Sequence, residues 1–352
     1  MRTLVLRLTA IFFLLILISC QSLGIKKEPS AYWEPVSQTL GGRTEFSELP
    51  GYETSIGEIW SSMHQSYTLP IQGFIQEKKI LLQEDTVLYP FSGIDVLNLF
   101  TFFPDSKNYV LFGLEDPGFP LNWDKKTSSE KKQILLGNKS LAAHLAGRNY
   151  FTYRAMREET KKPALSGALP VFLGFLNRLN KSIIDAEATE INSPKGNWKG
   201  FKLTLLDQIS GKIQTLTYWK IFLTGNEGEP GDGIYEYFTG LGKIAIFTKS
   251  AEYLFHGEKR AKFRDLLLER TNLIVQDDSG FPLRFFPSSD WNKSLYGQYT
   301  KSWNLSGAIK PEEQKEILEL SQGNQPLPFP FGYGVLGGKE KKQSVLFVIQ
   351  RK

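Results

Sequence analysis

Cysteine and histidine are scarce in this 352-residue sequence, which has one cysteine and three histidines. The single cysteine, Cys20, has no partner for an intramolecular disulfide, so the fold must be held by its apolar core. His64, His144 and His256 are widely separated and no H-E-x-x-H motif is present, so we expect no zinc site. With 41% hydrophobic and 13% aromatic residues, the chain can bury one large core or two smaller ones.

Clusters of one charge and common catalytic motifs are also missing. The net charge is +5, and removing Arg2 and Arg7 with an N-terminal signal would lower it by two, to +3. The lysines are scattered, so we expect no nucleic-acid partner, which would need basic residues grouped on one face. The lack of a G-x-S-x-G elbow argues against an α/β-hydrolase. The lack of a D-x-D-x-D loop argues against a site for a hard metal ion.

An almost uncharged apolar run, Leu8 to Ile18, stands near the N-terminus behind Arg2 and Arg7. A basic start, a short apolar core and a small residue before the cut predict a secretory signal peptide over residues 1–19. The run is too short to span a bilayer, which needs about 20 apolar residues.

The end of this segment, Leu17-Ile18-Ser19-Cys20, resembles the bacterial lipobox, whose cysteine is lipidated and becomes the mature N-terminus. We therefore predict acyl chains such as palmitate on Cys20, and a polar tether and loop over residues 20–50. Several acyl chains together give stable membrane attachment. The expected location is the bacterial cell envelope, on the periplasmic or surface face of a membrane. The alternative is a chance cysteine at the end of an ordinary signal peptide or membrane anchor.

Strand and helix patterns alternate through the rest of the chain, which predicts parallel strands with helices on both faces. We expect one α/β domain over residues 51–352, with a Rossmann-like wound sheet that is mostly parallel, an antiparallel insertion or extension, and a helical N-terminal segment. Its expected parts are a helical lead-in at 52–82, a first crossover at 86–116, antiparallel strands at 185–224, a second crossover at 243–286 and a C-terminal hairpin region at 287–352. We expect Pro70 to divide the lead-in into two helices. Within the second crossover, we expect a short helix over SAEYLFH and a strand over FPLRFF.

The first crossover carries the first candidate site. Ser92-Gly93 forms the turn after a nearly continuous apolar strand, and Glu115 ends the next strand about 20 residues later, as in dinucleotide-binding fingerprints. This layout of about 30 residues resembles the first crossover of class I S-adenosylmethionine-dependent methyltransferases. It departs from them because Gly93 stands alone where such enzymes place two or three glycines, and because S-adenosylmethionine is a cytoplasmic cofactor. Asp95 is either a helix cap or buttress, or a ligand contact.

Two further candidates follow the strands of the second crossover. Lys249 and Ser250 lie where a strand becomes the predicted helix, with Ser250 as its N-cap or a nucleophile and His256 as a C-cap, a packed ring or a base. Asp277 and Asp278 end the next strand, either as a ligand site or as an Asx-type turn with Arg284 as a partner. No cofactor follows from any of these residues.

Blocks such as YPFSGID, TKSAEYLFH and QDDSGFPLRFF, spread over most of the mature chain, resemble those of a family of exported bacterial proteins. The resemblance implies that this chain is a lipoprotein of the spirochaete type. The family brings no catalytic residues, since it has no assigned activity. Two functions remain open: a binding or scaffold domain that takes a small-molecule ligand, or a transferase or hydrolase with its site around Gly93, Glu115, Lys249 and Asp277. We expect these four residues to converge on one concave surface.

Overall fold

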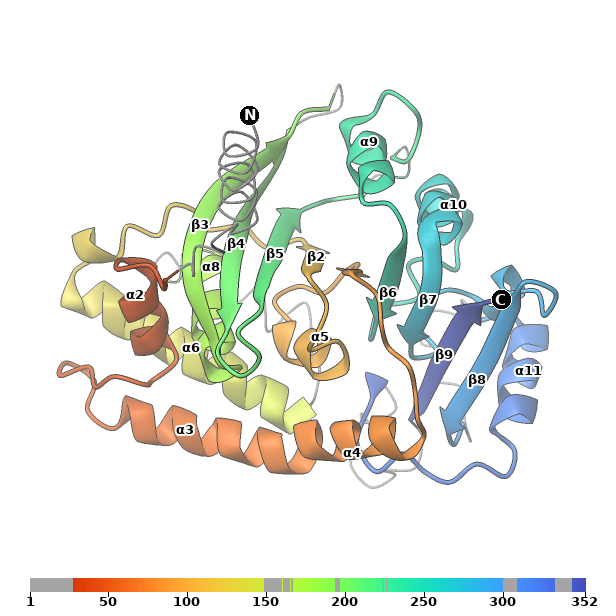
Figure 1. The fold of residues 1–352 in the computed structure, drawn as a ribbon, viewed down its shortest axis with the longest axis horizontal. Coiled ribbons are helices and arrows are strands. Elements are labelled where there is room, and N and C mark those ends of the chain that lie inside the picture. Colours follow the sequence, from red (N-terminus) through yellow and green to blue (C-terminus); the bar gives the residue numbers. More distant parts are fainter. Residues whose placement is uncertain are drawn as a thin grey trace, which may run out of the picture.

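Nine strands form one mixed sheet in a computed structural model of the chain (Figure 1). The structure describes residues 28–148, 160, 165, 167–193, 197–223, 225, 227–299, 309–332 and 344–352. The predicted signal peptide and Cys20 lie outside these residues. The strands are β1 (Thr86–Tyr89), β2 (Asn108–Gly113), β3 (Lys181–Ile191), β4 (Trp198–Asp207), β5 (Ile213–Lys220), β6 (Ile244–Thr248), β7 (Thr271–Gln276), β8 (Trp291–Gly297) and β9 (Val345–Arg351).

The strand order is β3-β4-β5-β2-β1-β6-β7-β9-β8, and its five central strands, β5 to β7, run parallel. At one side β4 and β3 continue the sheet as an antiparallel meander, and at the other side β9 lies antiparallel between β7 and β8. The α/β class is therefore confirmed. The sheet is not mostly parallel by pairing, however, because it has four parallel and four antiparallel neighbours.

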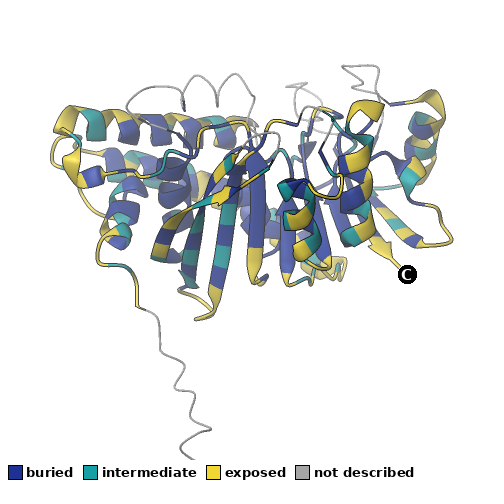
Figure 2. Cartoon of the chain, turned by 90° about the horizontal axis from the view of Figure 1, so that it is seen from above, coloured by how far each residue is buried: buried dark blue, intermediate teal, exposed yellow. Residues whose placement is uncertain are grey.

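Helices cover both faces of the sheet and enclose two apolar cores. Successive side chains of β1 point to opposite faces of the sheet: Val87 and Tyr89 face one core, and Leu88 faces the other. Figure 2 shows the central strands buried along most of their length and the outer sides of the helices exposed. The first core packs against α2 (Trp33–Leu40), α3 (Tyr52–Met63), α4 (Leu69–Glu77), α5 (Val96–Phe102), α6 (Ser128–Arg148) and α8 (Leu169–Arg178), and the second against α9 (Gly233–Gly240), α10 (Ala261–Arg270) and α11 (Pro311–Ser321).

The helical lead-in does not break at Pro70. A π-helical turn, His64–Thr68, joins α3 to α4, and the two helices follow one line in Figure 1. In a regular α-helix the ring of Pro70 would clash with the carbonyl group of Ser66, and its missing N–H would leave that carbonyl unpaired. The wider π turn places the proline at the start of α4, where its missing N–H is tolerated.

Two predicted elements are absent because their backbone cannot form them. SAEYLFH is a series of turns, since Ser250, Glu252 and Tyr253 all have φ between 53° and 56°, outside the right-handed helical region. FPLRFF is not a strand but contains a 3₁₀ turn at Leu283–Phe285, just after Pro282, which cannot donate to a sheet.

Two other regions are more ordered than the sequence suggested. Helix α2 lies inside the expected tether and loop at 20–50, where Glu34 accepts hydrogen bonds from Ile183 N and Ser182 Oγ of β3 at 2.8 and 3.2 Å. In the expected hairpin region, β8 and β9 do pair antiparallel, but α11 lies between them in the chain, so they are not joined by a tight turn.

Candidate functional site

The carboxyl ends of the parallel strands form one edge of the sheet, and the strand order reverses there. From β1 the chain moves to β2 on one side and later to β6 on the other. In sheets of this kind ligands bind outside the carboxyl ends at such a reversal. Gly93, Glu115, Lys249 and Asp277 follow β1, β2, β6 and β7, so all four reach this edge, but they form two separate groups.

The outer group surrounds a pocket with a volume of about 250 Å³. Gly93 and Glu115 belong to it together with Ser250 from the turn after β6. Apolar contact surface comes from Phe91 and from Ile221, which follows β5. The other residues that line this pocket, called the carboxyl-edge pocket below, are Gly113, Leu114, Ala251, Glu252 and Leu254.

Glu115 lines this pocket and is buried, with 6% of its surface exposed. Its Oε2 accepts hydrogen bonds from Leu114 N and Tyr218 Oη, both at 3.2 Å. Burial raises the pKa of the Glu115 carboxyl, because water no longer stabilises its charged form. Gly113 leaves room for this carboxylate: a Cβ there would lie 2.6 Å from Glu115 Oε2 and 2.9 Å from Gly93 Cα.

Backbone strain gathers at the rim of the carboxyl-edge pocket. Seven non-glycine residues in the described part of the chain have positive φ; three of them, Phe91, Ser250 and Glu252, line the pocket, and a fourth, Tyr253, follows Glu252 in the chain. Such conformations persist only where the surrounding structure imposes them, and they are common at ligand sites. The rim is therefore a built feature and not a relaxed pair of loops.

Asp95 is a helix cap and a buttress. Its Oδ1 accepts a hydrogen bond from Asn98 N at 3.1 Å and thereby caps α5. Its Oδ2 accepts from Asn98 Nδ2 at 2.5 Å and Tyr89 Oη at 3.2 Å, and lies 3.8 Å from Lys249 Nζ. Only 3% of the Asp95 side chain is exposed, so it does not meet a ligand in the carboxyl-edge pocket.

Lys249 lies behind the carboxyl-edge pocket. Its side chain has no exposed surface, and its Nζ lies 5.7 and 5.8 Å from the ring centres of Tyr67 and Phe331. Burial lowers the pKa of the Lys249 ammonium to about 8, and the charges of Asp95 and Asp277 counter part of that shift. The side chain ties the segments after β1, β6 and β7 together from inside.

Asp277 forms the predicted Asx-type turn. Its Oδ1 accepts hydrogen bonds from Ser279 N at 3.0 Å and Ser279 Oγ at 2.5 Å, while its Oδ2 accepts from Ser250 N at 2.9 Å. Asp278 instead accepts from Tyr253 Oη at 3.0 Å. Burial and the neighbouring Asp277 charge raise the pKa of Asp278 to about 7. Both carboxylates hold the strained turn after β6 in place.

Ser92 and His256 also have structural contacts, and Arg284 does not join the acidic turn. Ser92 is buried and its Oγ donates to the carbonyls of Gly93 and Phe112 at 3.1 and 3.3 Å. The His256 ring packs edge-on against Tyr253, so its packed-ring interpretation is confirmed, whereas no helix exists for it to cap. The predicted pairing of Arg284 with the aspartates is wrong, because Arg284 pairs with Glu313 at 3.1 Å and donates to the His256 carbonyl at 2.9 Å.

Sequence reasoning missed Gly113 and the tyrosines that fix the carboxylates. Gly113 ends the apolar run NYVLFG, and a glycine as the last residue of a buried strand is a usable signal for close backbone approach. Tyr218 gave no such signal, because its contact with Glu115 joins strands that are about 100 residues apart in the chain.

Within the described residues, no group of three or more His, Cys, Asp or Glu side chains is placed to hold a metal ion. No described helix combines the length and apolarity needed to cross a bilayer. No protein-family model matches this chain, and no curated protein matches its sequence.

Proposed function

We propose that this chain is a lipid-anchored envelope protein whose Rossmann-like wound sheet binds a small ligand in the carboxyl-edge pocket. The observation that carries the proposal is the buried carboxylate of Glu115, which faces a 250 Å³ pocket at the point where the strand order reverses. The membrane anchor rests on the lipobox-like sequence that ends at Cys20.

The lining of the pocket selects the ligand by charge and size. Its charged side chains are Glu115 and Glu252, and no lysine, arginine or histidine from the described residues lines it. A phosphate group would meet negative charge without a cation or a free helix end to balance it. The expected ligand is therefore neutral and rich in hydroxyl groups, or cationic. Typical pockets for drug-sized ligands hold about 300–1,000 Å³, so a monosaccharide or nucleoside fits better than a dinucleotide.

Binding without turnover fits the geometry better than a transferase or hydrolase. A general base must lie within hydrogen-bond reach of the proton that it removes. Lys249 and Asp277 are buried behind the pocket, and their hydrogen-bonding and ion-pair contacts hold the turn that carries Ser250. Of the four residues proposed for an enzyme site, Gly93 and Glu115 alone line the pocket.

Thermal-shift measurements on the purified protein would test this function. The ligand panel pairs adenosine with AMP, glucose with glucose 6-phosphate, and choline with phosphocholine. We expect one unphosphorylated member to raise the melting temperature and its phosphorylated partner to have little effect. A ligand at 100 times its Kd adds about 2.7 kcal/mol to the free energy of unfolding.

A matched pair of variants separates this pocket from other sites. Glu115→Gln should remove the thermal shift, because the amide loses the charge and one acceptor oxygen that bind hydroxyl or ammonium groups. Glu190→Gln, at an exposed position on β3, should keep the shift. A shift that survives Glu115→Gln, or a stronger effect of the phosphorylated compounds, would refute the proposed binding mode.

A further inference from the structure

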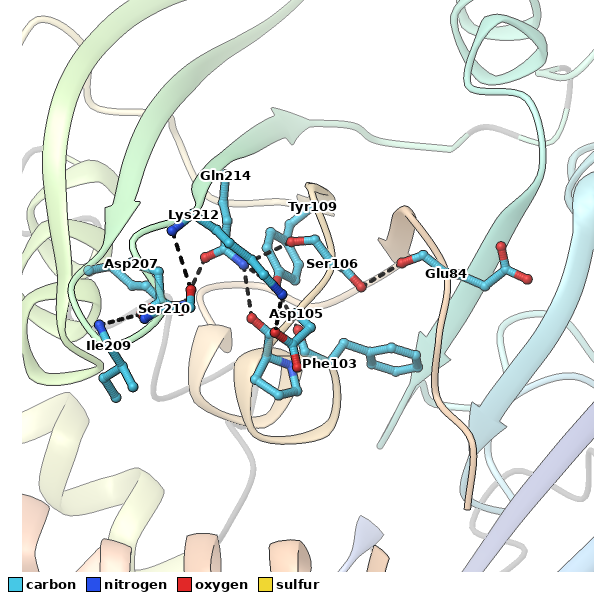
Figure 3. A network of polar contacts seen from close by, with 12 residues as sticks. Glu84, Phe103, Asp105, Ser106, Tyr109, Asp207, Ile209, Ser210, Lys212 and Gln214 are labelled. Atoms are coloured by element: carbon cyan, nitrogen blue, oxygen red, sulfur yellow. Dashed lines mark hydrogen bonds and ion pairs between the residues drawn. The ribbon is translucent and has the colours of Figure 1, made fainter. Parts of the chain in front are cut away.

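A second, larger cavity opens at the opposite, amino-terminal edge of the parallel strands. Its volume is about 400 Å³. It lies between α3, the π turn at His64–Thr68, α5, the start of β3 and the turn after β4. Figure 3 shows that turn, in which Asp207 Oδ1 accepts from the backbone of Ile209 and Ser210 at 2.8 and 3.2 Å.

Positive charge dominates this cavity. Lys181 is neutralised, because its Nζ lies 2.6 Å from Asp207 Oδ2 and donates to Gln214 Oε1 at 2.8 Å. Arg43 and Arg178 also line the cavity, and neither has a carboxylate within 4 Å among the described residues. Within the described part of the chain, two guanidinium charges therefore stand without a carboxylate partner at one cavity wall.

Arg178 is fixed in place but remains accessible. It donates to the carbonyl of Gly41 through Nε and to that of Gly42 through Nη2, the latter at 2.9 Å, so its planar group cannot swing away. Gly57 of α3 faces it, and a Cβ at that position would lie 3.6 and 3.7 Å from Nη2 and Nη1. A side chain added at this position would therefore begin in van der Waals contact with the guanidinium.

The electrostatics of this wall favour an added anion. Burial and the nearby Arg43 charge lower the pKa of the Arg178 guanidinium, so each positive charge disfavours the other. An acidic group between them would remove this repulsion and would accept from a planar donor group suited to carboxylate or phosphate.

Apolar and polar groups complete the cavity. Trp60 and Phe100 line it and are 7% and 4% exposed. The indole Nε1 of Trp60 is buried and has no hydrogen-bond partner in the described part of the chain. The π turn adds His64 and Thr68 to the lining, and π turns inside helices are frequent at functional sites.

We propose that this cavity binds a small organic anion, with its acidic group between Arg43 and Arg178 and an apolar ring against Trp60 and Phe100. The recognised chemistry is one carboxylate or phosphate group attached to an aromatic or aliphatic body. This site is separate from the carboxyl-edge pocket and has the opposite charge preference.

Isothermal titration calorimetry on the purified protein with phenyl phosphate, benzoate and benzyl alcohol would test the proposal. At least one of the two anions should bind, and the neutral alcohol should bind at least about tenfold more weakly. Arg43→Gln, at an exposed position, should weaken anion binding at least about tenfold through the loss of one charge-assisted hydrogen bond. Gly57→Glu should weaken it similarly, because the new carboxylate would pair with Arg178.

Two controls keep the result specific. Lys199→Gln removes an exposed positive charge near the start of β4, at the other edge of the sheet, and should leave binding unchanged. Glu115→Gln should also leave it unchanged, so this proposal can fail independently of the proposed function. Absence of heat with both anions, equal binding of benzyl alcohol, or full anion affinity in a folded Arg43→Gln variant would each overturn the proposal.

Discussion

Asp278 should cost the folded protein stability at neutral pH, and Asp278→Asn should remove that cost. The carboxyl group is half-buried, lies beside Asp277 and accepts a hydrogen bond from Tyr253 Oη at 3.0 Å. Burial and the Asp277 charge raise its pKa from 3.8 to about 7. The folded state therefore binds a proton more tightly than the unfolded state does. The stability gained from this bound proton is complete below about pH 4 and is lost as the pH rises through 7, where the carboxyl group becomes charged.

The size of the effect follows from the pKa. Each unit of pKa corresponds to about 1.4 kcal/mol, so the rise to about 7 sets a ceiling of about 4 kcal/mol. Solvent around the half-buried group screens the repulsion, and the hydrogen bond from Tyr253 partly stabilises the charged form of Asp278. We expect Asp278→Asn to raise the free energy of unfolding by about 1–2 kcal/mol at pH 8, because the asparagine carbonyl can still accept from Tyr253.

Urea unfolding of both proteins at pH 4.5, 6 and 8 would measure this difference. The gain from Asp278→Asn should be small at pH 4.5 and grow steadily to pH 8. Glu252→Gln, at an exposed position in the turn after β6, provides a control that should show no such trend. A gain that is independent of pH, or a less stable variant at pH 8, would refute the assignment of a raised pKa to Asp278.

Three further changes test other parts of the structure. Asp95→Ala should lower the free energy of unfolding by about 3–5 kcal/mol, because α5 loses its cap and the buried Lys249 loses a carboxylate. Asp95→Asn should lower it less, and urea unfolding of the two variants would measure the difference. Lys181→Met should also cost about 3–5 kcal/mol by leaving Asp207 buried without its cation, and a double-mutant cycle with Asp207→Asn should recover part of the loss. Cys20→Ala should move the protein from the membrane to the soluble fraction on cell fractionation, and unchanged membrane attachment would show that lipidation does not hold it.

The sequence predicted the parts of the fold that depend on local pattern. The continuous apolar strand before Ser92 and the crossover that follows it have the expected type, because burial on both faces of the sheet leaves an almost unbroken apolar run. The π turn before Pro70 and the turns at Ser250 depend instead on tertiary contacts, which override helical periodicity.

The sequence allowed the edge of the sheet that carries the candidate site to be predicted, but not which residues line the pocket. The strand ends place Gly93, Glu115 and Lys249 at one edge because parallel strands share a direction. The direction of each side chain depends on the backbone conformation of its own residue. Ser250 has a positive φ, and because it is not a glycine the sequence gives no signal of that conformation. Sequence spacing therefore could not separate the buried Lys249 from Glu115, which lines the pocket.

The position of β9 has a consequence for biosynthesis. Strand β9 follows β8 in the chain but lies between β7 and β8 in the sheet, so β8 has no neighbour among the described strands until residues 345–351 are made. A nascent chain cannot complete the sheet before residues 345–351 emerge, and domains with such long-range pairing fold slowly. For the exported protein proposed above, this delay would favour export before folding.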